Sequence, residues 1–111
     1  MRTTILQISQ EFALKKNLDL ADVLILDYML TFFGSGFAVQ YRETISGHEF
    51  GRANVYYWLS PNKLLSDLPI LKIQKRMLTR RLEKLEEKNI INRIVKNNKI
   101  FINFPNPMEF M

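Results

Sequence analysis

KRMLTRRLEKLEEKN, residues 75–89, is the stretch that decides the fold. Its leucines recur at intervals of three and four residues, and this spacing predicts a helix with one buried face. The leucines of that face are Leu78, Leu82 and Leu85. Arg76 and Arg80 fall nearly opposite them on the helix, with Thr79 and Glu83 beside the two arginines.

The charges along this helix are unevenly placed. Its first half is basic and contains no acid, whereas its second half carries Glu83, Glu86 and Glu87. Arg76 and Arg80 lie four residues apart, so they are like-charged neighbours whose repulsion costs an isolated helix about 0.2–0.5 kcal/mol. Glu83 can reach back to Arg80, but Arg76 has no acid within helical reach on its C-terminal side. Because a phosphate or a guanine edge would relieve the repulsion, the front of the helix is predicted to meet an anion.

The net charge of +5 is concentrated in one part of the chain. Residues 72–99 carry 10 basic and 3 acidic side chains, a net of +7, and the remaining residues carry 6 basic and 8 acidic ones, a net of −2. Such asymmetry is typical of a face that binds a polyanion, although a basic stretch is also common on a solvated surface. Charge alone does not distinguish a nucleic-acid-binding face from a solvated surface. The secondary-structure elements predicted around the helix are needed for that distinction.

Length and composition restrict the class of protein. The 111 residues suffice for one domain with a single core, and shares of 47% hydrophobic and 24% charged residues are those of a globular protein. The chain has no cysteine, which excludes a disulfide framework and a thiolate metal site. Its longest apolar run, residues 23–33, contains Asp27 and is too short to cross a bilayer, which needs about 20 apolar residues. The first residues also lack the features of a signal peptide, so we expect a cytoplasmic protein that contacts no membrane.

A central helix is predicted before the basic stretch. Asp19 is a good N-cap for a helix over residues 20–33, and Asp22 adds negative charge to its first turn. Apolar residues cover most sides of this helix, so it should be buried in the middle of the domain. We expect it to end at Gly34.

A second helix is predicted to lead directly into the basic stretch. Ser60 supplies an N-cap, and Pro61 occupies the first helical position, where no amide hydrogen is needed. The helix should end before Pro69, and its apolar residues are Leu64, Leu65 and Leu68. The sequence PILKI, residues 69–73, then forms a tight connection to the next helix.

The region N-terminal to these helices is predicted to hold short elements. TTILQIS, residues 3–9, is β-branched and alternating, which predicts a short leading strand. Ser9 is then expected to cap a short helix that includes Phe12 and Leu14 and fades over residues 15–17.

All four glycines fall between Gly34 and Gly51, so residues 34–54 are predicted to be a loop or hairpin insertion. The two arms of this hairpin would be FAVQYRETI, residues 37–45, and FGRANVYYWL, residues 50–59, paired around Ser46, Gly47 and His48. The YYWL part is predicted to be a strand, because its aromatic side chains suit a pleated, half-buried surface.

A C-terminal hairpin is predicted from IINRIVKNNKIFINF, residues 90–104. Its turn would be Asn97-Asn98, because asparagine tolerates the left-handed conformation that such turns need. With that turn one face of the hairpin is mostly apolar and should pack on the core. It consists of Ile91, Arg93, Val95, Ile100, Ile102 and Phe104. Lys96 and Lys99 flank the tip.

The predicted order is helix, strand, helix, tight turn, helix and β-hairpin. This is the order of a winged helix-turn-helix, an α+β fold in which a three-helix DNA-binding unit carries a hairpin wing. We expect residues 1–111 to form one domain, with an N-terminal extension over 1–17, a core over 18–104 and a tail over 105–111.

The sequence also resembles a known family. LDLADVLILDY, residues 18–28, and YYWLSPNKLLSDLPILKIQKRMLTRRLEKLEEKNIINR, residues 56–93, are similar to the N-terminal winged-helix domain of phage and plasmid replication proteins of the replisome-organiser and replication-initiator type. The resemblance covers residues 18–104 and is weakest over 34–54. Relatives often have glycine and serine where this chain has Lys72 and Gln74, and they usually continue into further domains. The resemblance implies DNA binding in replication initiation, while transcription regulation and plasmid transfer stay open.

The expected site is a recognition helix that enters the major groove by its N-terminal part. Arginine binds guanine through two parallel hydrogen bonds, and a threonine can supplement this at a neighbouring base. The recognition residues are predicted to be Gln74, Lys75, Arg76, Thr79 and Arg80. Contacts to the phosphate backbone are expected from Lys72, Lys84, Lys96, Asn97, Asn98 and Lys99. The partner would be double-stranded DNA, and no cofactor or metal is needed.

Two alternatives accompany this prediction. An enzyme acting on a small molecule is not expected, because His48 beside Glu49 fits a surface loop, capping explains Asp19 and Asp22, and Asp27 has no obvious partner. The stronger alternative is a protein-interaction or oligomerisation module of a replication assembly, either a homodimer or a complex with a replication or transfer protein. Exposed apolar residues in the N-terminal segment and in the tail would serve it, unless they fold over the core or are disordered ends. The tail residues are Met108, Phe110 and Met111.

Overall fold

The central helix α2, Leu20–Gly34, begins with two reciprocal capping contacts. The Asp22 amide donates to Asp19 Oδ1 at 2.9 Å, and the Asp19 amide donates to Asp22 Oδ2 at 3.2 Å. The predicted cap is therefore confirmed, and so is the burial of the helix. Its buried apolar side chains are Val23, Ile25, Leu26, Met29 and Phe33.

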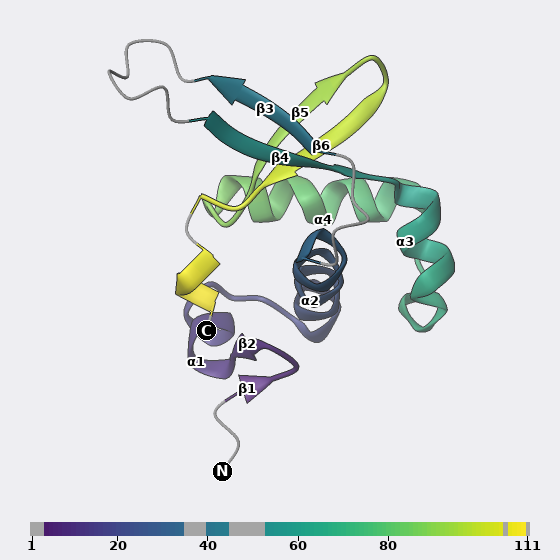
Figure 1. Ribbon diagram of the computed structural model, residues 1–111. Helices are drawn as coiled ribbons and strands as arrows, with labels where there is room; N and C mark the ends of the chain where they lie inside the picture. The colour runs from purple at the N-terminus through teal and green to yellow at the C-terminus, as the bar shows by residue number, and fades with distance from the viewer. Residues whose placement is uncertain (1–3, 35–39, 45–52, 106, 111) are drawn as a thin grey trace.

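A computed structural model describes residues 4–34, 40–44, 53–105 and 107–110 (Figure 1). After α2 the chain forms β3 (Gln40–Thr44), β4 (Ala53–Leu59), α3 (Pro61–Asp67), the 3-10 helix η1 (Pro69–Leu71), α4 (Lys75–Glu87), β5 (Asn92–Lys96) and β6 (Lys99–Asn103). β1 (Thr4–Ile5), β2 (Ile8–Ser9) and α1 (Gln10–Lys15) precede α2, and the 3-10 helix η2 (Pro107–Phe110) follows β6. The fold is α+β.

The four long strands form one antiparallel sheet in the order β3-β4-β6-β5. The expected pairing within residues 37–59 is confirmed for β3 and β4, with Thr44 opposite Ala53, while the expected turn at 46–48 lies outside the described residues. β4 joins this hairpin to the C-terminal one through the pairing of Tyr57 with Ile102. In Figure 1, α4 runs along one face of the sheet, α2 crosses below it almost end-on, and α3 lies at one side.

The C-terminal hairpin has the predicted turn. Asn97 and Asn98 both adopt left-handed conformations, with φ of 53° and 63°, and Lys96 pairs with Lys99 across the turn. The predicted face is buried at its base, where Ile102 is fully covered, but Val95 is 63% exposed. The prediction that the whole face packs on the core is therefore wrong at Val95, which lies next to the exposed tip of the hairpin.

The N-terminal segment and the tail share the core of the domain. Residues 3–9 do not form one strand, since β1 and β2 pair with each other as a small hairpin whose turn places Leu6 at φ 58°. Ser9 caps α1 as predicted, by accepting from the Phe12 amide at 3.3 Å. Phe110 is only 1% exposed and packs on Phe12, with ring centroids 5.3 Å apart. Phe110 is thus no exposed handle, and Met108 and Met111 lie outside the residues whose side chains are described.

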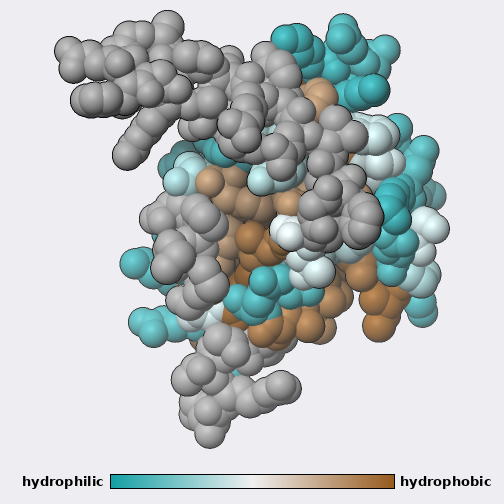
Figure 2. Space-filling model, viewed as in Figure 1, coloured by the Kyte–Doolittle hydropathy of each residue, from teal (hydrophilic) through white to brown (hydrophobic). Residues whose placement is uncertain are grey.

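One hydrophobic cluster extends from the N-terminal segment through α2, α3 and α4 to the sheet and Phe110. On the face that Figure 2 shows, brown hydrophobic residues are visible in the centre and at the lower right, and most teal hydrophilic ones lie toward the edges. Within the described ranges, no helix is both long and apolar enough to cross a membrane.

Candidate nucleic-acid interface

Helix α4 presents two sides of opposite character, as its sequence predicts. Leu78, Leu82 and Leu85 are completely buried against the core. Arg76 and Arg80 lie on the opposite side and are exposed. Among the described residues neither arginine has an ion-pair partner, and the expected contact from Glu83 back to Arg80 is not formed. The outer side of α4 therefore carries two uncompensated positive charges one helical turn apart.

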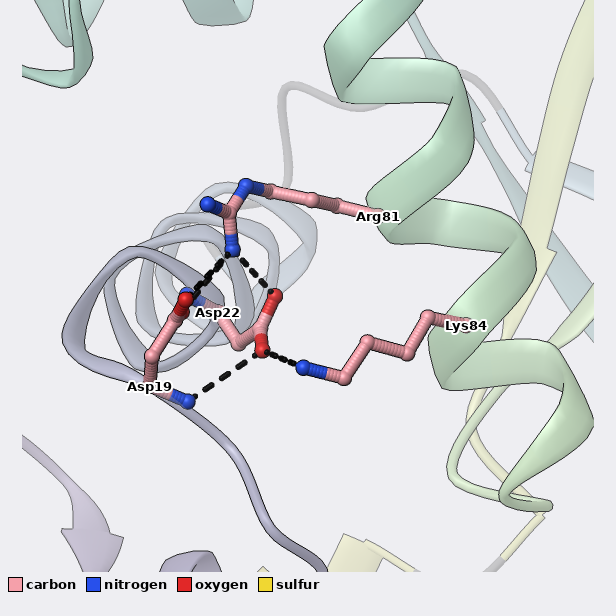
Figure 3. A network of polar contacts seen from close by, with 4 residues as sticks. All are labelled: Asp19, Asp22, Arg81 and Lys84. Atoms are coloured by element: carbon pink, nitrogen blue, oxygen red, sulfur yellow. Dashed lines mark hydrogen bonds and ion pairs between the residues drawn. The ribbon is translucent and has the colours of Figure 1, made fainter.

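Two other cations of α4 are paired with two carboxylates at the start of α2, one in its first turn and one just before it (Figure 3). Asp22 is fully buried, and its Oδ1 accepts from Arg81 Nη1 at 3.0 Å while its Oδ2 accepts from Lys84 Nζ at 2.7 Å. The same Arg81 nitrogen donates to Asp19 Oδ1 at 2.8 Å and to Oδ2 at 3.0 Å. We call Asp19, Asp22, Arg81 and Lys84 the carboxylate clamp. It fixes the rotation of α4 about its own axis and turns Arg76 and Arg80 outward.

The clamp has clear electrostatic consequences. Partial burial raises the pKa of Asp19, but the hydrogen bond from the Asp22 amide and the Arg81 guanidinium outweigh burial and hold that pKa below its ordinary value of 3.8. In return, the hydrogen bond to Asp19 raises the pKa of Arg81. Lys84, which the sequence placed among the phosphate contacts, has its ammonium committed to the buried Asp22. We therefore assign Lys84 to the clamp.

Helix α3 is tied to α2 by a second set of polar contacts. The Tyr28 hydroxyl donates to Asp67 Oδ2 at 2.8 Å, and Lys63 donates to the same oxygen at 3.1 Å. These contacts lower the pKa of Asp67, while burial and the Asp67 carboxylate raise the pKa of Tyr28. Lys63 Nζ also lies 5.6 Å from the centre of the Phe32 ring. Both helices of the α3–α4 unit are thus held on α2 by polar contacts as well as by packing.

The connection between α3 and α4 has two unfavourable residues. The backbone of Lys72 adopts a left-handed conformation, with φ 52° and ψ 38°. Residues other than glycine and asparagine rarely adopt this conformation. Gln74 occupies the N-cap of α4 but makes no capping hydrogen bond with its side chain. Both side chains are exposed at the front of α4, as is Lys75. Thr79 is half-buried, and its hydroxyl donates to the Lys75 carbonyl at 3.1 Å.

The β5–β6 hairpin lies beside the front of α4. Arg93 of β5 pairs with Glu86 of α4 at 3.4 Å, which connects the hairpin to the rear of the helix. At the front, Lys75 lines a notch of about 150 Å³ together with Asn98 and Lys99 of the hairpin tip. Lys96 and Asn97 are exposed at the same tip. The structure therefore brings Lys75, Asn98 and Lys99 together around the notch, whereas Arg80 lines a separate hollow with Lys84 of the clamp.

The sequence did not single out two residues that shape this surface. Trp58 of β4 lines the notch, and Lys99 Nζ lies 5.2 Å from the centre of its ring. Met77 is 48% exposed on α4, beside the clamp. Met77 is an apolar residue that lies off the leucine face of the helix, and this departure from the helical pattern can be seen in the sequence. Nothing in the sequence pairs Trp58 with a residue 41 positions away.

The features weighed for catalysis have structural explanations where they are described. Asp27, expected to lack a partner, accepts from Gln7 Nε2 at 2.9 Å, and the same nitrogen lies 2.9 Å from Thr31 Oγ1. The part of the chain that the structure describes holds no cluster of acidic or histidine side chains able to bind a metal ion. His48 and Glu49 lie outside that part.

No family model matches the chain, and neither a curated protein nor a solved structure is found to match it. What this surface binds is therefore inferred from its own geometry and charge.

Proposed function

We propose that the protein is a cytoplasmic winged helix-turn-helix protein that binds double-stranded DNA, with α4 as the recognition helix. Its front end would enter the major groove, which is about 12 Å wide and admits an α-helix. The β5–β6 hairpin would act as a wing on the adjacent phosphate backbone. This function needs no cofactor and no metal.

The observation that carries the proposal is the exposed pair Arg76 and Arg80. The clamp neutralises Arg81 and Lys84 internally, whereas Arg76 and Arg80 have no acidic partner within the described residues. Holding two like charges one turn apart is unfavourable unless an anion or a hydrogen-bond acceptor lies against them. The O6 and N7 atoms of guanine and the backbone phosphates supply such acceptors.

The surroundings of the two arginines support the same partner. Lys72, Lys75 and Lys99 are exposed near the front of α4 and its neighbouring hairpin. The acidic residues of α4 lie at its rear, where Glu86 is paired with Arg93. A basic front and an acidic rear match a helix whose N-terminal part enters the groove and whose C-terminal part leaves it.

The resemblance of residues 18–104 to phage and plasmid replication proteins supports a role in replication initiation. Regulation of transcription and plasmid transfer use the same kind of DNA contact and are the alternatives. Because one recognition helix reads only a short half-site, specific binding would need a dimer or several sites.

Fluorescence anisotropy with a labelled duplex of mixed sequence, measured over a series of salt concentrations, tests the proposal. We expect the affinity of the unmodified protein to fall steeply with salt, because bound cations release counterions from the DNA. The double variant Arg76→Ala/Arg80→Ala should bind at least about tenfold more weakly, because it loses two arginine contacts with bases or phosphates. Selection from a random pool of duplexes would then define the preferred site.

A matched control removes the same charge elsewhere. Lys15 and Lys16 end α1, which Figure 1 places away from α4, so Lys15→Ala/Lys16→Ala should bind like the unmodified protein. Absence of binding by the unmodified protein at low salt would contradict the proposal and favour a protein-interaction module. Equal losses in both double variants would show that only net charge matters.

A further inference from the structure

The notch between α4 and the β5–β6 hairpin brings together two lysines that are distant in the sequence. Lys75 is the first residue of α4, Lys99 is the first residue of β6, and both line the notch. The other lining residues are Trp58, Leu59, Ser60, Pro61, Asn98 and Ile100. None of the described residues that line this hollow is acidic, so the two lysines are not compensated among them.

Two other hollows at the surface differ in this respect. The hollow of about 330 Å³ beside the clamp is lined by cations, but Asp19 is part of its wall and pairs with Arg81. The hollow of about 240 Å³ beside α1 is lined by Glu11 and Glu109 as well as Lys15. Of these three hollows, only the notch has two cations in its described lining and no carboxylate that would compete with a bound anion.

Trp58 holds one of the two lysines in place. The Lys99 ammonium lies 5.2 Å from the centre of the Trp58 ring, within the range of about 6 Å for a cation–π contact. The backbone that carries the indole is held in turn, because Trp58 pairs with Phe101 in the centre of the β4–β6 ladder. A lysine side chain loses much rotamer freedom when it binds an anion, and a lysine already held over a ring has less freedom to lose.

The remaining polar groups of the notch can also donate to an anion. Ser60 Oγ accepts from the Lys63 amide at 3.3 Å as the cap of α3, which leaves its hydroxyl hydrogen available. Asn98 is exposed and carries an amide NH₂. The notch, of about 150 Å³, is larger than a single water site and has room for a phosphate group.

We propose that Lys75 and Lys99 bind one and the same backbone phosphate in this notch, and that Trp58 is the positioning residue for Lys99. This inference rests on the proposed function, since the phosphate belongs to the bound DNA. It assigns a joint contact to the recognition helix and the wing, and this contact would fix how deeply α4 enters the groove.

The salt dependence of DNA binding tests whether the phosphate is shared. Each phosphate that the protein neutralises contributes about 0.9 to the slope of log affinity against log salt concentration. We expect the double variant Lys75→Gln/Lys99→Gln to lower the slope by about 0.9, because one phosphate contact is lost. A decrease of about 1.8 would mean two separate phosphates and would overturn the shared site. The distant variant Lys15→Gln is the control and should leave the slope unchanged.

A double-mutant cycle tests the role of Trp58. Trp58→Leu removes the ring and should weaken DNA binding about two- to fivefold, the change that corresponds to an exposed cation–π contact. In a Lys99→Gln background the same substitution should have no further effect, because there is no ammonium left to position. Trp58→Phe keeps an aromatic ring, so its affinity for DNA should lie between that of the unmodified protein and that of Trp58→Leu. This intermediate value separates the positioning of Lys99 from a loss of folding. An undiminished effect of Trp58→Leu in the Lys99→Gln background would overturn the positioning role.

The failure of this inference differs from failure of the proposed function. If the Arg76→Ala/Arg80→Ala variant loses binding while the Lys75 and Lys99 variants keep the full affinity and slope, the function stands and the notch is not a phosphate site. If the unmodified protein does not bind DNA at low salt, both proposals are overturned.

Discussion

Asp22 is a fully buried carboxylate, and its surroundings explain why four basic residues of one helix have two different roles. Taking a carboxylate out of water is unfavourable unless cations and hydrogen bonds replace the lost hydration. Arg81 and Lys84 supply the cations at 3.0 and 2.7 Å, and the Asp19 amide supplies a further hydrogen bond. Arg81 and Lys84 are thus needed inside the protein, whereas Arg76 and Arg80 are not.

This division predicts a large effect on stability for one pair of substitutions and almost none for the other. Arg81→Ala/Lys84→Ala should lower the free energy of unfolding by about 3–5 kcal/mol, because the Asp22 charge stays buried without a cation. Arg76→Ala/Arg80→Ala should change it by no more than about 0.5 kcal/mol, because both side chains are exposed. Urea denaturation followed by circular dichroism measures both values.

A third variant isolates the cause of the loss. Adding Asp22→Asn to the Arg81→Ala/Lys84→Ala variant removes the buried charge while keeping an oxygen for the Asp19 amide, so part of the stability should return. If the triple variant is no more stable than the double one, lost packing of the two long side chains explains the effect better than charge does.

The connection between α3 and α4 is the element in which stability and proposed function conflict. Lys72 is in the left-handed conformation that glycine adopts readily, and Gln74 makes no capping bond. Glycine at the first of these positions and serine at the second would suit this geometry better. A stabilising pair of residues is therefore absent at the place where exposed donors would face the DNA.

Lys72→Gly/Gln74→Ser should consequently raise the free energy of unfolding by about 1–2 kcal/mol, by relieving the left-handed lysine and capping α4. The same variant should bind duplex DNA more weakly and with a shallower salt dependence, because a phosphate contact is lost. Thermal unfolding and anisotropy on one protein sample check both effects. A variant that is more stable and binds DNA as well as before would show that Lys72 and Gln74 do not contact the ligand.

Elements with local signals could be predicted from the sequence, and those set by distant contacts could not. Ser60-Pro61 and Asn97-Asn98 fix a helix start and a turn through their own conformational preferences, and both are confirmed. The turn at Leu6 uses a left-handed residue without glycine or asparagine, so the division of residues 3–9 into two strands had no local signal.

The same limit applies to the candidate site. The helical spacing of α4 was sufficient to predict which residues face outward. It was not sufficient to show that Lys84 pairs with Asp22, because that ion pair joins residues 62 positions apart. The contact between Trp58 and Lys99 is likewise a tertiary one, produced by the pairing of β4 with β6. Charge in the sequence showed where cations are abundant, and only the fold showed which of them are already paired.

Across the whole molecule, one core joins the segments at both ends of the chain to the α3–α4 unit. Phe110 packs on Phe12 of α1 and on Phe104 beyond β6, with ring centroids 5.3 and 5.6 Å apart. Phe104 in turn lies 5.9 Å from Phe33 of α2, the helix that carries the clamp. The scaffold that orients α4 thus extends to residues far from the proposed DNA surface.

Phe110→Ala should therefore destabilise the whole domain and not only its tail. Deleting a buried phenylalanine costs about 3–5 kcal/mol, because transfer free energy is lost and a cavity is left. Leu14→Ala on α1 is the control, since Leu14 is 79% exposed and its removal should change stability by less than about 0.5 kcal/mol. Under conditions in which the Phe110→Ala variant is still folded, its affinity for DNA should equal that of the unmodified protein, because no residue of the proposed surface has changed. Urea denaturation followed at several wavelengths measures the loss, and a change no larger than that of Leu14→Ala would mean that Phe110 contributes little to the core.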